Sequence, residues 1–117
     1  MHDTLLIGWT TVGSEAAAQR IARGLVESEL AACVQIDAGV QSVYCWQGEV
    51  VSEREWRLMV KFAAARSGEL LAYLEANHPY EVPEWVTVRA DAVAPAYLNW
   101  ALDPAGEANP PEEHSAD

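Results

Sequence analysis

Apolar and polar residues alternate along two neighbouring segments in the middle of the chain. In residues 34–46 and 50–62 the even-numbered positions are mostly apolar, whereas many odd-numbered positions are polar or charged. Alternation with a period of two predicts β-strands. The short polar segment at residues 47–49 joins the two strands and predicts a β-hairpin.

The alternation also predicts the register of this hairpin. A three-residue loop would pair Trp46 with Val50 and Val40 with Trp56, which keeps one face apolar, and a bulge elsewhere, for instance at Gly39, would do the same. Each arm would extend about 40 Å, whereas the flanking helices would cover only about 20 Å. The apolar face therefore overhangs the core and needs a cover, for which we expect further copies of the chain. The expected subunit contacts are Tyr44, Trp46, Val50 and Trp56.

The rest of the chain predicts two further strands and three helices. Residues 4–11 are a short apolar run, and helical periodicity follows in residues 15–29 after a capping Ser14. A second helix is expected to be capped by Ser67 and to end near His78, because Pro79 disfavours helix at the residue before it. Residues 85–90 predict a strand, and residues 95–102 a last helix. The order β-α-β-β-α-β predicts an α+β, ferredoxin-like fold with a long hairpin and an extra C-terminal helix.

Composition and charge narrow the function classes. The chain has 117 residues and a net charge of −11, which argues against nucleic acid and anionic membrane surfaces as partners. No apolar run approaches the 18–20 or so residues of a membrane span, and no signal peptide is evident, so a cytoplasmic protein is expected. Residues 1–102 are interpreted as one domain. Residues 103–117 hold five acidic residues and no Lys or Arg and predict a disordered acidic tail, with an interaction tail as the alternative.

Several segments together resemble the CutA divalent-cation tolerance family. They occur in the family's order and spacing over about residues 4–102. The matching segments are residues 30–34 (LAACV), 42–48 (SVYCWQG), Lys61, 78–84 (HPYEVPE) and 97–100 (YLNW). The resemblance implies a homotrimer shaped like PII signalling proteins, and a role in tolerance to copper and other divalent metals.

The sequence differs from some family members at the residues to which copper binding is assigned. Some family members place a Cys at the end of the first strand and two adjacent His before the Pro, and copper is assigned to those three residues. Here the corresponding residues are Thr10, Asn77 and His78. A soft copper site without its thiolate and one imidazole loses much of its selectivity.

One set of side chains remains as a candidate metal site. His78, Glu81 and Glu84 lie close together in sequence, and imidazole and carboxylate ligands suit copper or another divalent cation. In the alternative interpretation His78 only closes its helix, bonding the last carbonyls. The other histidines, His2 and His114, lie near the ends of the chain and are not expected to act.

A second function class is a PII-like regulatory module. It would bind a small ligand or a partner protein in clefts between subunits, and Lys61, Tyr80 and Trp85 are the candidates for lining such a cleft. Enzyme signatures are missing, since there is no phosphate-binding glycine-rich loop and no GxSxG motif, so no catalytic residue is assigned. Cys33 and Cys45 lie on one predicted strand, too far apart for a disulfide, and are expected to be reduced thiols.

Overall fold

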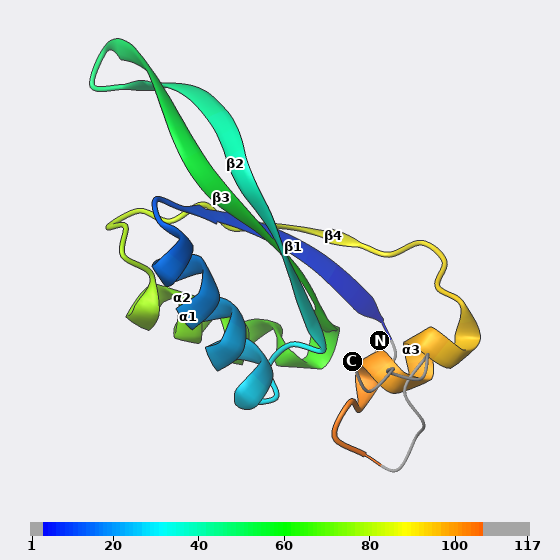
Figure 1. Ribbon diagram of the computed structural model, residues 1–117. Helices are drawn as coiled ribbons and strands as arrows, with labels where there is room; N and C mark the ends of the chain where they lie inside the picture. Colours follow the sequence, from blue (N-terminus) through cyan, green and yellow to red (C-terminus); the bar gives the residue numbers. More distant parts are fainter. Residues whose placement is uncertain (1–3, 107–117) are drawn as a thin grey trace, which may run out of the picture.

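The structure is a computed structural model that describes residues 4–106. Residues 1–3 and 107–117 lie outside the described part, and with them His2, His114 and most of the predicted tail. Figure 1 shows a long hairpin that rises away from the helices. The elements are β1 (Leu5–Val12), α1 (Glu15–Glu27), β2 (Cys33–Trp46), β3 (Glu49–Ala63), a 3₁₀ turn (Ala64–Arg66), α2 (Ser67–Asn77), β4 (Val86–Arg89) and α3 (Pro95–Leu102).

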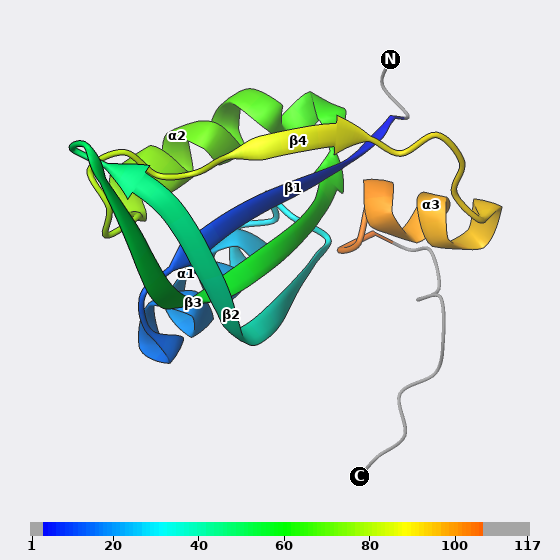
Figure 2. The same ribbon diagram turned by 90° about the horizontal axis from the view of Figure 1, so that it is seen from above.

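The strands form one antiparallel sheet in the order β2-β3-β1-β4. Helices α1 and α2 lie together on one side of it, whereas α3 stands apart from them (Figure 2). This is the ferredoxin-like arrangement, so the predicted α+β fold, its long hairpin and its extra C-terminal helix are confirmed. None of the helices in residues 4–106 is long and apolar enough to cross a membrane.

The main core lies between the sheet and helices α1 and α2. Helix α1 begins as predicted, because the Ser14 hydroxyl accepts a hydrogen bond from the backbone N–H of Ala17 at 3.1 Å. The Trp85 ring lies directly on Gly8, where a Cβ would overlap it, and packs against Phe62. A smaller cluster beside α3 contains Leu5, Ala32 and Ala101. The buried residues of the main core are Val12, Ala17, Ala18, Ile21, Ala22, Leu25, Leu30, Ala31, Leu58, Val60, Phe62, Leu70 and Leu74.

The hairpin differs from the three-residue loop that the alternation favoured. Trp46 pairs with Glu49, so the loop has two residues, Gln47 and Gly48, with φ of 51° and 84°. Two successive residues with positive φ make the tight turn that suits the twist of a hairpin. The bulge that was named as the alternative is present, because the register shifts between Asp37 and Val40 at a bulge that contains Gly39 (φ 76°). The apolar face that it was expected to preserve is not continuous, since Val40 lies opposite Glu55 and Trp46 opposite Glu49.

This bulge changes which residues share a face. Beyond it, Val40 pairs with Glu55 and Tyr44 with Val51, so Tyr44 and Trp46 lie on the sheet face opposite to Trp56. Trp56 is half-buried against the main core and has the Arg54 guanidinium over its ring. The four expected subunit contacts therefore do not form one face of a protomer. Near the tip, Tyr44, Trp46 and Val50 are 39%, 57% and 78% exposed.

The overhang inferred from strand length is present. The arms contain 14 and 15 residues, and the molecule measures 50 × 37 × 25 Å with a radius of gyration of 15.4 Å. A compact domain of this size has a radius of gyration of about 13 Å. Figure 1 shows the outer half of the hairpin beyond α1 and α2.

The sheet also leaves part of its second face uncovered. Trp9 pairs with both Met59 and Val86, and Ile7 pairs with Val88, so these side chains lie on the face opposite to α1 and α2. Val86 and Val88 are 54% and 46% exposed. We call these five residues the open sheet face.

One predicted boundary is wrong. Ser67 was expected to cap α2, but the 3₁₀ turn leads directly into this helix, Arg66 is its N-cap, and no side-chain capping bond is made. The other predicted boundaries lie within two residues of those observed, and α3 occupies residues 95–102 as predicted.

Candidate functional site

The residues that carried the metal prediction lie where α2 ends beside β1. The backbone N–H of His78 donates to Leu74 O at 2.8 Å, and Pro79 follows, so the helix stops here. The His78 ring then turns toward the sheet. Its Nε2 lies 3.0 Å from the Thr10 hydroxyl oxygen and 3.0 Å from the Thr11 carbonyl oxygen, both on β1.

The contacts define which ring nitrogen carries the proton. The backbone N–H of Tyr80 lies 3.1 Å from His78 Nδ1. Because an amide N–H can only donate, Nδ1 must offer its lone pair. The Thr11 carbonyl can only accept, so Nε2 carries the ring proton. His78 is therefore a neutral imidazole with both nitrogens in hydrogen bonds.

Tyr80 extends this network to the hairpin. Its ring packs against that of His78 at 5.1 Å between centroids, and its hydroxyl donates to Glu55 Oε2 at 2.7 Å. Glu55 is on β3, one residue past the last position that pairs with β1. Its side chain is nevertheless only 6% exposed. Gly13 leaves room for the phenol, since a Cβ there would lie 3.2 Å from the Tyr80 hydroxyl. We call Thr10, Thr11, His78, Tyr80 and Glu55 the β1-end network.

Burial changes the acidity of both rings in this network. It lowers the pKa of His78 below its ordinary 6.5, against smaller opposing effects of the Thr11 carbonyl and Glu55, and Arg20 adds to the lowering. Burial also raises the pKa of Tyr80 far above its ordinary value, and its hydrogen bond to Glu55 adds to the effect. Both rings are thus held in their neutral forms near pH 7.

The predicted metal ligands are not gathered into a site. Glu81 and Glu84 are exposed, while His78 is half-buried and directed at β1. Within residues 4–106 there is no group of three or more His, Cys, Asp or Glu side chains placed to hold a metal ion. The simpler interpretation of His78 also needs amending, because its ring bonds β1 and the next loop rather than the last carbonyls of α2.

The three predicted cleft residues lie in different places. Tyr80 belongs to the β1-end network, and Trp85 packs in the main core on Gly8. Lys61 lies on the opposite face, directly across from Cys33, with its amine 5.6 Å from the centre of the Tyr97 ring on α3. Burial and the neighbouring Cys33 raise the pKa of Tyr97. Both cysteines are free; Cys33 is half-buried and Cys45 is exposed.

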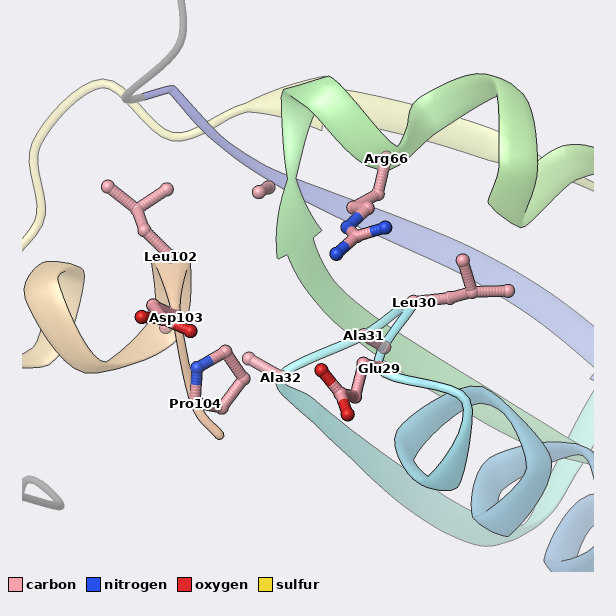
Figure 3. A pocket seen from close by; sticks show the side chains of 10 residues that line it. Glu29, Leu30, Ala31, Ala32, Arg66, Leu102, Asp103 and Pro104 are labelled. Carbon is pink, nitrogen blue, oxygen red and sulfur yellow. The ribbon is translucent and has the colours of Figure 1, made fainter. Parts of the chain in front are cut away.

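A hollow lies at the other end of the molecule. Figure 3 shows it where the chain leaves α1, enters α2 and ends α3. Its charged side chains are Glu29, Asp103 and Arg66, and Arg66 already pairs with Glu69 at 3.3 Å. None of the predicted site residues lines this hollow.

No sequence pattern singled out Glu55, the most buried acidic residue of the network. Glu55 lies in the polar series of the hairpin together with Glu53 and Arg57, and the alternation does not distinguish it from them. Thr10 and Thr11 lay in a strand that could be predicted, but their partner is 67 or 68 residues away. Only the packing of the α2–β4 connection against β1 brings these groups together.

Comparison with known proteins decides the family. Residues 6–103 match the CutA1 divalent ion tolerance protein family. The chain belongs to this family. It is 42% identical to the divalent-cation tolerance protein CutA of Thermus thermophilus over 91% of this chain and all of that relative, and 36% identical to a CutA homologue of Xenopus laevis over 88% of this chain and 68% of the relative.

Solved CutA structures share the fold. The Thermus thermophilus structure gives a TM-score of 0.81 at 42% identity over 83% of this chain and 94% of that chain. CutA1 from Oryza sativa gives a TM-score of 0.84 at 32% identity over 89% and 95%. The names of other CutA relatives place them in different compartments, one chloroplastic in Arabidopsis thaliana and one periplasmic in Archaeoglobus fulgidus.

Proposed function

We propose that this chain acts in divalent-cation tolerance, as a cytoplasmic homotrimer and without catalysis. The observation that carries the proposal is the match of residues 6–103 to a family named for tolerance of divalent ions rather than for a reaction. Copper is the first cation to test, because the resemblance of the sequence points to it.

Self-association is supported by the surfaces that the protomer leaves uncovered. Helices α1 and α2 lie on the other side of the sheet from the open sheet face, and Val86 and Val88 remain about half exposed. The hairpin tip exposes Trp46 and Val50 in addition. Each fully buried apolar side chain contributes roughly 1.5–3 kcal/mol, so covering these residues with further copies would be strongly favourable.

Light scattering tests the assembly. The wild-type chain is expected to give three times the protomer mass at micromolar concentration. Val86→Glu combined with Val88→Glu places two charges on the open sheet face and should give a folded monomer. Thr87→Glu is the matched control, because it lies between them on the other face and is already exposed. A wild-type monomer, or a trimer unaffected by the double substitution, would contradict the proposal.

Growth tests the cellular role. A bacterial strain without its own CutA should regain tolerance of excess copper(II) when it expresses the wild-type chain. The Thr87→Glu chain should restore tolerance equally, and the Val86→Glu/Val88→Glu chain should not. Failure of the wild-type chain at matched expression would count against the tolerance role.

The second candidate is a PII-like module that binds a small ligand or partner protein between subunits. The Lys61 amine beside the Tyr97 ring supports it, since its positive charge attracts an anionic ligand. Tyr80 and Trp85 remain candidates for other parts of such clefts. This function predicts a thermal shift with a small molecule that a chelator does not remove and that Lys61→Ala abolishes.

A further inference from the structure

The family name implies a divalent cation, and His78 is the imidazole ligand of the metal site that the sequence predicted. An imidazole binds a metal through a free lone pair on one ring nitrogen. In His78 the Nδ1 lone pair accepts the Tyr80 N–H at 3.1 Å, and Nε2 carries a proton toward the Thr11 carbonyl at 3.0 Å. No nitrogen of this ring is free to bind a metal.

The groups around His78 do not supply the missing ligands. The Thr10 hydroxyl lies 3.0 Å from Nε2. It is a neutral oxygen and does not replace the soft thiolate ligand that a copper site prefers. The Asn77 amide is turned back onto its own helix, where Nδ2 donates to Tyr73 O at 2.8 Å. Glu81 and Glu84 are exposed and join no three-ligand group within the described chain.

We infer that His78 of this chain is not a metal ligand but a neutral positioning residue, whose two hydrogen bonds fix the α2–β4 connection to β1 and hold Tyr80 on Glu55. The inference is independent of the proposed function, since tolerance and assembly can fail or hold whatever His78 binds. The lowered pKa of His78 agrees with it, because a ring buried between these partners favours the uncharged form.

The position of Tyr80 shows what this residue accomplishes. Its backbone N–H is held by Nδ1, its ring packs on the imidazole at 5.1 Å, and its hydroxyl reaches Glu55 at 2.7 Å. Without the imidazole, the Tyr80 N–H and the Thr11 carbonyl both lose their partner. The loop that carries the phenol would then keep its hydrogen bond to Glu55 but lose both bonds made by the imidazole.

A metal titration separates the two roles of His78. The chain has three histidines, so the experiment uses a His2→Ala/His114→Ala background, in which His78 is the only imidazole. Copper(II) is titrated by calorimetry with glycine as a weak competitor, because a chain of charge −11 collects cations loosely. The expected result is the same unsaturated isotherm with and without a further His78→Asn substitution. A saturable uptake of about one copper per chain that His78→Asn abolishes would overturn the inference.

Nitrogen NMR of the same background chain tests the positioning role directly and needs no variant of His78. The expected spectrum has Nε2 in the protonated range and Nδ1 in the unprotonated range, and zinc(II) leaves both resonances in place. The opposite tautomer, or a zinc-dependent shift of either nitrogen, would overturn the inference.

Amide hydrogen exchange in two variants of His78 is a further test of the positioning role. In His78→Asn, whose side-chain oxygen can still accept the Tyr80 N–H, amide exchange at Tyr80 should stay slower than in His78→Ala. Equal exchange in the two variants would also count against the positioning role.

Discussion

Replacing Tyr80 by Phe removes one oxygen atom from the β1-end network and leaves the ring in place. The lost hydroxyl is a donor to Glu55 at 2.7 Å, and Glu55 is only 6% exposed. Water therefore has little access to replace the donor. A hydrogen bond to a charged group contributes about 1.5–3 kcal/mol, and a buried acceptor left without its partner costs a similar amount. Tyr80→Phe should thus lower the free energy of unfolding by about 1.5–3 kcal/mol.

Urea unfolding at one fixed protein concentration measures this change. For a domain of this size, the midpoint should fall by on the order of 1 M urea. Tyr73→Phe is the matched control. Its hydroxyl lies against Gly24 on α1, and no hydrogen bond to it is found within residues 4–106. The control should change the stability by no more than about 0.5 kcal/mol.

The pair Tyr80–Glu55 can be separated from other effects by a double-mutant cycle with Glu55→Ala, which removes the acceptor oxygens. We expect a coupling energy of at least about 1 kcal/mol between the two positions. If Tyr80→Phe costs no more than Tyr73→Phe, or if the cycle shows no coupling, then the hydrogen bond does not stabilise the fold and the argument from burial is wrong.

Three further predictions follow from pKa and backbone geometry. Burial lowers the pKa of His78, so as the pH falls the unfolded chain binds a proton before the folded chain does. The free energy of unfolding should therefore be at its full value above about pH 6.5 and decrease below it. In His78→Asn, unfolding measured over the same pH range should no longer show this decrease. Glu29 follows the C-cap residue of α1 and has φ 63°, and Glu29→Gly should raise the melting temperature by relieving up to about 1 kcal/mol of strain. Gly48→Ala should cost about 1 kcal/mol in urea unfolding, although no atom lies within 4 Å of the new Cβ, because Gly48 has φ 84°.

The elements could be predicted because each has a local cause. The Ser14 cap is a contact between residues three apart, and Pro95 begins α3 as expected. The long hairpin could be predicted because the two-residue alternation of apolar and polar positions continues through both arms. The loop length could not, because the alternation favours pairing apolar with apolar positions, whereas the bulge at Gly39 shifts the register and sets Val40 opposite Glu55. The positive φ of Gln47, a residue that rarely adopts it, is visible only in the structure.

The candidate site could be predicted only in part. Proximity in sequence suggested that His78, Glu81 and Glu84 act together, but a loop with two prolines spreads them, and the His78 ring finds its partners on β1. Tyr80 was expected in a cleft between subunits, and its observed partner, Glu55, was not expected at all. Contacts between residues 25 to 68 positions apart depend on how the layers pack, which period and spacing do not encode.

The β1-end network depends on three backbone features that occur in separate parts of the sequence. Strand β1 makes its last pair at Val12 with Trp56, so Glu55 lies beyond its end, where Gly13 offers no side chain. The bulge at Gly39 then sets Val40 opposite Glu55, and Pro79 ends α2 so that the Tyr80 phenol enters the space over Gly13. A change at any of the three should therefore disturb the same hydrogen bond. Gly13→Ala tests this most simply, because its Cβ would press on the Tyr80 hydroxyl at 3.2 Å, and its cost should shrink when Tyr80 is already Phe. An undiminished cost in the double variant would mean that Gly13 is needed for another reason.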